Sequence, residues 1–481
     1  MTKAKFSKKQ LPRKKDDLSA WFLAVVQAAE LADYAPVRGT MVFRPWGYAL
    51  WERVQESLDK LIKGMGVENT YFPLFIPLSL LEKEKSHVEG FAPELAVVTH
   101  GGGEKLAEPL VVRPTSETIM YAMFAKWIKS WRDLPLKINQ WCNVVRWEKR
   151  TYPFLRTTEF LWQEGHTAHA THEEAEEQVR EALAVYEKEF AEYFALAGIT
   201  GIKSEAEKFA GGLKTTCFEV LLPDGRALQA ATSHDLGQNF ARAFEVKFQN
   251  QVGEEEFVWQ TSWGLSTRAL GGMLMIHGDD QGLFLPPALA PLQVIIVPIF
   301  SEGEKSVIEE YLRQLVRELE AELRVRVDDR SSHTPGWKFN YWEVKGVPLR
   351  LEIGRREVEE EKVLLFRRDT LEKEYLPRRG IKEQLKTILG DQMQQARERS
   401  RRFIEKQTRE VNDYQEFKEI MAEERGLIRA FWCGNPDCEA QIKTETKATT
   451  RCRPFALEKE KGHCIYCRQP AQERWYFAQA Y

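Results

Sequence analysis

The segment 139–164 constrains the fold of this 481-residue chain more than any other. Residues 139–148 predict a long strand, and residues 157–164 predict a second strand that returns after a short polar loop. Strands joined in this way pair antiparallel, because a parallel pair needs a long crossover connection. The chain is therefore expected to contain an antiparallel sheet with a loop held between two of its strands.

This pair of strands carries two arginines, a carboxylate and an aromatic ring, namely Arg146, Glu148, Arg156 and Phe160. The planar fork of an arginine binds two phosphate oxygens at once and stays charged. Arg268 adds a third guanidinium where a helix-like run begins. Together these groups predict a clamp for a bent ATP. For the Arg-x-Glu pattern alone, a surface hairpin with ion pairs is the competing interpretation.

The second of these strands also predicts a pocket for a small amine. Side chains alternate across a strand, so every second residue from 160 to 166 faces the same side. That side carries aromatic, acidic and imidazole groups, a combination that suits a small-molecule site. The residues are Phe160, Trp162, Glu164 and His166.

Two further segments offer polar groups to such a pocket. In the segment 113–117, Thr115 is predicted to cap a helix, and Glu117 in its first turn could accept a hydrogen bond from a substrate ammonium or imino group. Plain helix capping is the alternative. A hairpin with an Asp224-Gly225 turn joins residues 217–222 to 227–234, whose polar members are weaker candidates: Gln229, Thr232 and His234.

Other phosphate-binding folds are disfavoured. The sequence has no G-x-x-x-x-G-K-[ST] loop and no G-x-G-x-x-G after a predicted strand. Residues 101–103, three consecutive glycines, are interpreted as a hairpin tip. Strands joined by hairpins, with helices inserted, instead favour an α+β domain built on an antiparallel sheet.

The pattern changes after Pro286-Pro287. Apolar strands then alternate with helices, which predicts an α/β module with a parallel component, and a charged helical stretch at 382–406 leads into a Cys-rich tail. The expected organisation is a flexible basic arm at 1–19, a catalytic domain at 20–287, an α/β domain at 288–390 and a small C-terminal α+β domain at 391–481.

Seven cysteines are present, and five of them follow residue 430. Two close pairs, Cys433 with Cys438 and Cys464 with Cys467, predict the four-thiolate shell of a closed, structural zinc site. A disulfide or free thiols is the alternative. Cys452 is then surplus, and His463 is a less favoured substitute for one sulfur.

The composition limits the classes of protein to which this chain can belong. A net charge of −3 means that contact with nucleic acid must come from local patches. No apolar run is long enough to cross a bilayer, and the first residues lack a signal-peptide core, so a cytoplasmic location is expected.

Several motifs together resemble the prolyl-tRNA synthetases, which are class II aminoacyl-tRNA synthetases, in the form typical of archaea and eukaryotes. The resemblance extends from about residue 20 to residue 481 and is carried by Arg113-Pro-Thr-Ser-Glu117, Val145-Arg-Trp-Glu148, Phe154-Leu-Arg-Thr157, Glu159-Phe-Leu-Trp-Gln-Glu-Gly-His166, Ala231-Thr-Ser-His234, Thr261-Ser-Trp-Gly-Leu-Ser-Thr-Arg268, His277-Gly-Asp-Asp280, His333-Thr-Pro-Gly336 and Ala480-Tyr481.

The resemblance implies roles for individual residues. Arg146, Glu148 and Arg268 would be catalytic. The ATP site, with Mg²⁺, would comprise Arg146, Glu148, Arg156, Thr157, Phe160, Gln229, Thr232, Ser266 and Arg268. The proline pocket would comprise Thr115, Glu117, Arg146, Trp162, Glu164, His166, His234 and Ser262. Base contacts to the anticodon would come from Phe339, Glu343 and Arg350.

The resemblance also implies an activity and partners. The chain is expected to use ATP to activate L-proline and to transfer it to tRNA(Pro), as a homodimer whose interface is built by Arg44-Pro45 and the helix that follows. Residues between His166 and Thr261 leave no room for the editing domain of the bacterial form. The alternatives are a related threonyl, seryl, glycyl or histidyl specificity, and a non-catalytic RNA-binding paralogue.

Overall fold

A seven-stranded sheet forms the centre of the N-terminal region in this computed structural model, which describes residues 11–83, 95–300, 305–455 and 460–481. All neighbouring strands are antiparallel except the edge pair β3 and β7. The order is β3 (Glu68–Asn69), β7 (Leu136–Val145), β8 (Glu159–His169), β14 (Trp259–Ser266), β11 (Ala227–Gly237), β10 (Lys214–Leu221) and β9 (Ile199–Ile202). The predicted antiparallel sheet is confirmed.

The predicted strand pair at 139–164 is present with shifted ends. β7 and β8 pair continuously from Leu136 opposite Ala168 to Val145 opposite Glu159. The connecting loop therefore covers 146–158, and it holds Arg146 and Arg156 at one end of the sheet. The segment 70–77 contributes only the short β4 (Phe75–Pro77), because its prolines cannot donate ladder hydrogen bonds.

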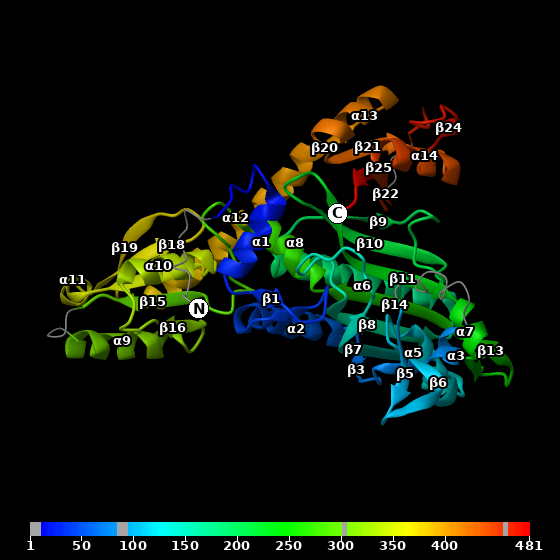
Figure 1. The fold of residues 1–481 in the computed structure, drawn as a ribbon, viewed down its shortest axis with the longest axis horizontal. Coiled ribbons are helices and arrows are strands. Elements are labelled where there is room, and N and C mark those ends of the chain that lie inside the picture. Colours follow the sequence, from blue (N-terminus) through cyan, green and yellow to red (C-terminus); the bar gives the residue numbers. More distant parts are fainter. Residues whose placement is uncertain (1–10, 84–94, 301–304, 456–459) are drawn as a thin grey trace.

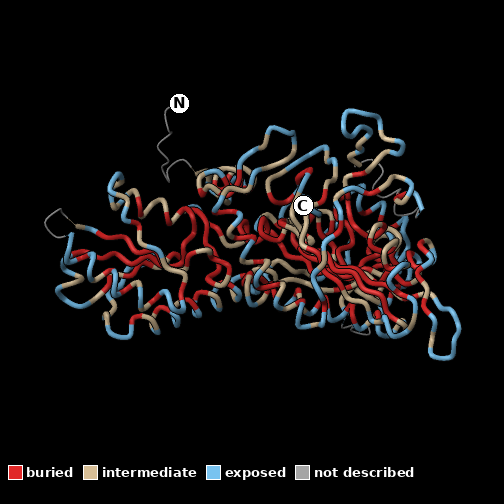
Figure 2. The backbone as a smooth tube through the Cα atoms, turned by 90° about the horizontal axis from the view of Figure 1, so that it is seen from below, coloured by how far each residue is buried: buried red, intermediate tan, exposed pale blue. Residues whose placement is uncertain are grey.

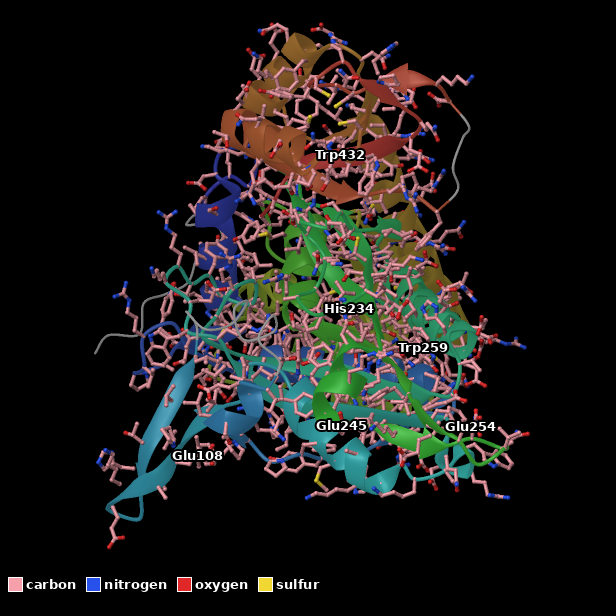
Figure 3. The ribbon with its side chains drawn as sticks, turned by 90° about the vertical axis from the view of Figure 1, so that its right-hand side faces the viewer. Glu108, His234, Glu245, Glu254, Trp259 and Trp432 are labelled. Atoms are coloured by element: carbon pink, nitrogen blue, oxygen red, sulfur yellow. The ribbon has the colours of Figure 1, made fainter. Side chains whose placement is uncertain are left out.

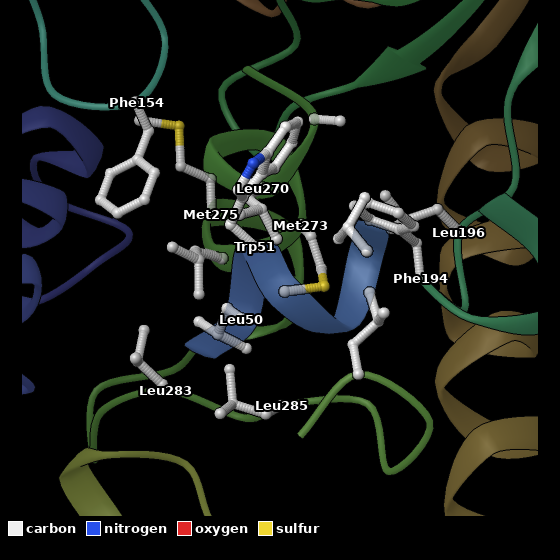
Figure 4. Close-up of a cluster of buried hydrophobic side chains, with 14 of the residues drawn as sticks. Leu50, Trp51, Phe154, Phe194, Leu196, Leu270, Met273, Met275, Leu283 and Leu285 are labelled. Carbon is white, nitrogen blue, oxygen red and sulfur yellow. The ribbon is translucent and has the colours of Figure 1, made fainter. Parts of the chain in front are cut away.

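One face of the sheet is covered by α6 (His172–Glu192), α2 (Pro45–Lys63) and α8 (Arg268–His277), which share a large apolar core. α6 begins where the Thr171 side chain accepts a hydrogen bond from the Glu174 amide, which caps the helix. Trp51 of α2 and Met273 of α8 lie in this core (Figure 4). α1 (Leu18–Ala28) packs beside them.

The other face carries α5 (Glu117–Trp127) and α7 (Asn239–Phe244), which share a second apolar cluster. The N-cap of α5 is Ser116, so the prediction that Thr115 caps this helix is wrong; the Thr115 hydroxyl donates instead to the Glu117 carboxylate. The hairpin of β5 (Ala96–Gly101) and β6 (Glu104–Val112), marked by Glu108, projects from the domain (Figure 3). Its tip is glycine-rich, as predicted.

The shorter elements of this region complete its edges. They are β1 (Ala32–Tyr34), β2 (Met41–Phe43), α3 (Leu78–Leu81), the 3-10 turn Trp131–Asp133, β12 (Lys247–Gln249) and β13 (Glu255–Phe257). β1 pairs with β2, β12 with β13, and β4 with β6.

The middle region is a separate α/β unit, at the left of Figure 1. Its sheet has the order β16 (Val325–Val327), β15 (Val294–Pro298), β17 (Leu349–Ile353), β18 (Lys362–Arg367) and β19 (Lys373–Pro377), with the first three strands parallel, which confirms the predicted parallel component. The central strands β15 and β17 are buried throughout (Figure 2) and pack against helices. The helices are α9 (Lys305–Leu319), α10 (Pro335–Val344) and α11 (Arg355–Glu359).

The long helix α12 (Ile381–Gln407) leads to the C-terminal region, at the upper right of Figure 1. A four-stranded sheet there has the order β20 (Thr408–Glu410), β21 (Leu427–Phe431), β25 (Arg474–Gln479) and β22 (Ala448–Cys452). α13 (Tyr414–Glu423), α14 (Pro436–Thr446), β23 (Gly462–His463) and β24 (Pro470–Ala471) surround it.

A buried ion-pair cluster joins the C-terminal region to the central sheet. Glu219 of β10 binds Arg451 of β22 through two hydrogen bonds of 2.7 and 2.9 Å, and it also binds Lys203. All three side chains are at most 5% exposed. None of the helices in the described ranges combines the length and apolarity that a bilayer crossing requires.

Residues 1–10 of the expected basic arm lie outside the described residues. In the rest of that segment, Lys14 contacts the end of α8. The Lys14 ammonium donates to the carbonyl oxygens of Ile276 and Gly278, at 3.3 and 2.5 Å. It thereby binds the C-terminal end of the helix that begins with Arg268.

Candidate active site

One cavity of about 210 Å³ lies over the central sheet, and it brings the two key arginines together. Arg146 at the end of β7 and Arg268 at the start of α8 both line it. Eleven other residues predicted for the site also line this cavity, namely Thr115, Glu117, Phe160, Trp162, Glu164, His166, Gln229, Thr232, His234, Ser262 and Ser266. The alternation that placed residues 160–166 on one face of a strand is confirmed.

The remaining predicted nucleotide-site residues line a smaller neighbouring cavity. It shares Arg146, Phe160, Ser266 and Arg268 with the first and adds Glu148, Arg156 and Thr157. Arg156 approaches Glu148 with its Nε 3.5 Å from Oε1. All predicted residues of the ATP and proline sets therefore lie in two adjoining cavities.

The arginine end of the site concentrates positive charge. The Arg146 guanidinium lies 5.5 and 5.4 Å from the ring centres of Phe160 and Trp162, and its Nε donates to the Pro114 carbonyl at 3.1 Å. Arg268 donates from Nε to the Leu155 carbonyl at 2.9 Å. Burial, followed by the charges of Arg156 and Arg146, lowers the pKa of Arg268 to about 10. Such an arrangement favours an anionic ligand.

The opposite end of the site is an acidic and imidazole-lined pocket. His166 Nε2 lies 3.0 Å from Glu164 Oε2, and the Gln140 amide donates to Glu164 Oε1 at 2.8 Å. Burial alone would raise the pKa of Glu164, but the hydrogen bond and charge of His166, with bonds from Ser116 and Gln140, lower it to about 2. Glu164 is therefore ionised at neutral pH.

The pKa values of the two histidines of the pocket are shifted in opposite directions. Burial would lower the pKa of His166, but the hydrogen bond to Glu164 and the charges of Glu117 and Glu164 raise it. Burial and the charge of His166 lower the pKa of His234 to about 3. His234 is neutral and lies 2.9 Å from the Thr215 hydroxyl. Among the described residues, Ser262 Oγ is buried without a hydrogen-bond partner, which leaves it for a polar ligand.

The sequence reasoning missed several residues that line the cavity, and four of them come from one part of the chain. Glu207, Lys208, Phe209 and Thr215 come from the segment between β9 and the start of β10. Phe209 packs on His234 with the ring centres 4.7 Å apart. This segment has no strand or helix pattern, so its only signal is a single aromatic residue beside two glycines.

The four predicted zinc ligands also come together. The Sγ atoms of Cys433, Cys438, Cys464 and Cys467 lie within 4.8 Å of one another, and Cys433 is 3.7 Å from both Cys438 and Cys467. Tetrahedral zinc with Zn–S bonds of about 2.3 Å places sulfurs about 3.8 Å apart, so this donor set fits zinc. His463 is exposed and outside the group, and Cys452 is buried beside Cys217.

The predicted anticodon residues form a cluster at the junction of α10 and β17. The Arg350 guanidinium lies 4.1 Å from the ring centres of Phe339 and Phe366, and it donates to Glu343 Oε1 at 2.6 Å. It also donates to Glu352. Arg350 is buried, so a base can reach its guanidinium only if one carboxylate partner is exchanged. The role of this cluster stays a prediction.

Comparison with known proteins agrees with this architecture. The family model described as "tRNA synthetase class II core domain (G, H, P, S and T)" matches residues 102–277. The model "Anticodon binding domain" matches 293–388, and "Prolyl-tRNA synthetase, C-terminal" matches 414–481. The antiparallel sheet, its arginine-lined cavity and these matches define a class II aminoacyl-tRNA synthetase.

Full-length similarity narrows the class to one family. The chain is 51% identical to "Proline–tRNA ligase" of Natranaerobius thermophilus over 98% of both chains. It is 49% identical to "Proline–tRNA ligase 2" of Clostridioides difficile over 98% of both, and 51% identical to "Proline–tRNA ligase" of Chlorobium limicola over 98% of this chain and 99% of that one. The chain belongs to the proline–tRNA ligase family.

Proposed function

We propose that this protein uses ATP to activate L-proline as prolyl-adenylate and then transfers the prolyl group to the 3′ end of tRNA(Pro), in cytoplasmic protein synthesis. One observation carries the proposal. The arginine cluster and the Glu164–His166 pocket open into the same cavity, so a triphosphate and an amino acid would meet there. Membership of the proline–tRNA ligase family supports proline as the substrate.

The nucleotide occupies the arginine end. Arg146 and Arg268 bind phosphate oxygens, and Phe160 offers its ring to the adenine, with Glu148, Arg156 and Thr157 beside them. The remaining contacts are Gln229, Thr232 and Ser266. Mg²⁺ bound with ATP would neutralise part of the phosphate charge near Gln229 and Thr232.

Proline occupies the acidic end. Its positively charged imino group binds near Thr115 and Glu117, which line the same cavity as Glu164. Trp162, His166, His234 and Ser262 enclose the ring. Glu164 is ionised at neutral pH and lies 3.0 Å from His166, whose pKa it raises, so the pocket keeps a fixed negative charge beside the imidazole.

The reaction needs alignment more than acid–base chemistry. The proline carboxylate attacks the α-phosphorus of ATP, and pyrophosphate leaves. The terminal ribose hydroxyl of tRNA then attacks the adenylate carbonyl, and AMP leaves. Arg146 and Arg268 neutralise the charge that develops on the phosphates, and the cavity holds the reacting groups in line.

Two other features complete the proposal. Zinc bound by Cys433, Cys438, Cys464 and Cys467 is structural, because four thiolates leave no open coordination position. A homodimer forms through Arg44-Pro45 and α2. Val42 and Tyr48, exposed by 50% and 42%, support an apolar contact surface there.

The domain arrangement proposed is that of the archaeal and eukaryotic type, although the relatives named above are bacterial. The C-terminal match at 414–481 supports it, as do α6 and the β10–β11 hairpin, which occupy the chain between His166 and Thr261. The boundaries proposed remain 1–19, 20–287, 288–390 and 391–481. Phe339, Glu343 and Arg350 are proposed to contact the anticodon of tRNA(Pro).

The decisive experiment measures ATP–pyrophosphate exchange with each of the twenty amino acids. Proline alone should support exchange near its full rate. Exchange that depends on threonine, serine, glycine or histidine would identify a different specificity. Absence of exchange with every amino acid, by zinc-loaded and folded protein, would favour the non-catalytic RNA-binding alternative.

A further inference from the structure

The motif His277-Gly278-Asp279-Asp280 begins at the last residue of the helix that presents Arg268. α8 runs from Arg268 to His277, and every residue from Ala269 to Met275 is buried. Its ten residues therefore form one rigid connection from the nucleotide end of the cavity to Asp279. The Asp279 backbone is also held in place, because the Trp21 indole donates to its carbonyl oxygen at 2.9 Å.

Asp279 is bound by an arginine from the middle region. Arg368 donates to both carboxylate oxygens, from Nη1 at 2.8 Å and from Nη2 at 2.5 Å. The Arg368 side chain is only 1% exposed, although Asp279 is half-exposed. A buried guanidinium that binds a carboxylate through two parallel bonds fixes the orientation of both partners.

The third nitrogen of the same guanidinium reaches α10. Arg368 Nε donates to the Glu343 carbonyl oxygen at 3.1 Å, and the Glu343 carboxylate accepts a bond from Arg350. Glu343 and Arg350 belong to the cluster proposed to contact the anticodon. One side chain, Arg368, thus joins that cluster to the end of α8.

The backbone around the Arg368–Asp279 pair is closely packed, so the segment after α8 has little freedom to move relative to α10. The Leu283 amide donates to the Val344 carbonyl at 3.0 Å, and the Leu285 amide donates to the Gly346 carbonyl at 3.1 Å. Gly282 has a φ of +133°, and a Cβ there would lie 2.6 Å from the Val344 Cα. The segment after α8 therefore packs directly on the end of α10, so a shift of Glu343 acts on Asp279.

We propose that Asp279 and Arg368 are positioning residues that couple the anticodon-contacting cluster to α8, and hence to Arg268, in the tRNA-dependent step. This inference rests on the proposed function. Without tRNA, the buried core around α8 keeps Arg268 in place by itself. When a correct anticodon engages Glu343 and Arg350, the Arg368–Asp279 pair transmits the change to the catalytic cavity.

The test compares two readouts in full-length, zinc-loaded enzyme. Asp279→Asn keeps the shape of the side chain and removes its charge. Asp280→Asn is the matched control, because Asp280 binds the Lys14 amide and has no contact with Arg368. Arg368→Lys is a second variant that keeps the buried positive charge and loses the paired bonds. Each is assayed for proline-dependent pyrophosphate exchange, and for aminoacylation of tRNA(Pro) and of a transcript with one anticodon base replaced.

Exchange should stay within about 2-fold of wild type in all variants. The anticodon penalty is the ratio of the aminoacylation kcat with tRNA(Pro) to the kcat with the altered transcript. Asp279→Asn and Arg368→Lys should reduce this penalty by about 5-fold, the size of a modest coupling between sites. KM for tRNA should not change, and Asp280→Asn should keep the full penalty. An anticodon penalty that is unchanged in both variants would overturn the inference, as would an equal loss of exchange and aminoacylation. Loss of the fold in both variants would also overturn it. So would a wild-type penalty that appears only in KM for tRNA and not in kcat. Wild-type enzyme without proline-dependent exchange would instead refute the proposed function, and the inference with it.

Discussion

The buried carboxyl of Glu189 makes the stability of this protein depend on pH in a predictable direction. Glu189 lies on α6 against α2, where the Ser57 hydroxyl donates to its Oε1 at 2.7 Å. Among the described residues, its second oxygen has no hydrogen-bond partner. Burial, opposed only in part by the Ser57 bond, raises the pKa of Glu189 from 4.5 to about 8. The folded protein therefore keeps this carboxyl protonated over a range where the unfolded chain has ionised it.

The sign follows from proton binding. Since the folded pKa is the higher one, the stabilising effect of the protonated carboxyl is complete below pH 4.5 and is lost as the pH rises to 8. Between pH 5 and pH 8 the two pKa values correspond to a loss of about 3 kcal/mol. For a domain of this size, that loss lowers the melting temperature by about 10 °C.

Glu189→Gln removes the titrating proton and keeps the oxygen that binds Ser57. Its melting temperature should fall about 10 °C less than that of wild type between pH 5 and pH 8, measured by scanning calorimetry in the same buffers. Glu187→Gln is the matched control, because Glu187 is exposed on the same helix, and it should follow wild type. Equal slopes for wild type and Glu189→Gln would refute the reasoning, since they would mean that the carboxyl does not change its protonation on unfolding.

Four further predictions concern the site and its supports. Arg268→Ala should lower proline-dependent pyrophosphate exchange by about 10²- to 10³-fold with the fold intact by circular dichroism, as expected for a lost transition-state donor; normal exchange would contradict its role. Phe209→Ala should raise KM for proline about 10-fold and leave KM for ATP nearly unchanged, because the ring packs on His234; equal changes in both constants would argue against a proline-side wall. Metal analysis should find one zinc ion in wild type and none in Cys433→Ser, whereas zinc-free wild type with a readily alkylated Cys433 would exclude the site. Glu219→Gln should destabilise the junction by about 3 to 5 kcal/mol, because two buried cations lose their carboxylate, and limited proteolysis should then release the C-terminal region faster; unchanged cleavage would show that other contacts hold it.

Features set by local geometry could be predicted from the sequence. Alternation along β8 placed Phe160, Trp162, Glu164 and His166 on one side because side chains of any strand alternate. The cysteine prediction also rested on local geometry, because cysteines a few residues apart can bind the same metal ion. Two such pairs predict one four-thiolate site when they come together. The family resemblance alone supplied Thr157, Ser262 and Ser266, which neither periodicity nor spacing distinguishes.

Features set by contacts between distant segments could not be predicted. Phe209 reaches the cavity only because the chain before β10 folds over His234. Lys203, Glu219 and Arg451 meet although Arg451 is 232 residues beyond Glu219 in the chain. The Thr115 prediction was wrong for a related reason: the hydroxyl can bind either a backbone amide or the Glu117 side chain, and only the packed structure decides between them.

The burial of the Lys203–Glu219–Arg451 cluster bears on how the protein can be handled. Mobile salt weakens attraction between exposed charges, including those that attract RNA, but it barely reaches groups enclosed by protein. Washing with concentrated salt should therefore strip adhering nucleic acid from the surface while the C-terminal region stays attached to the central sheet.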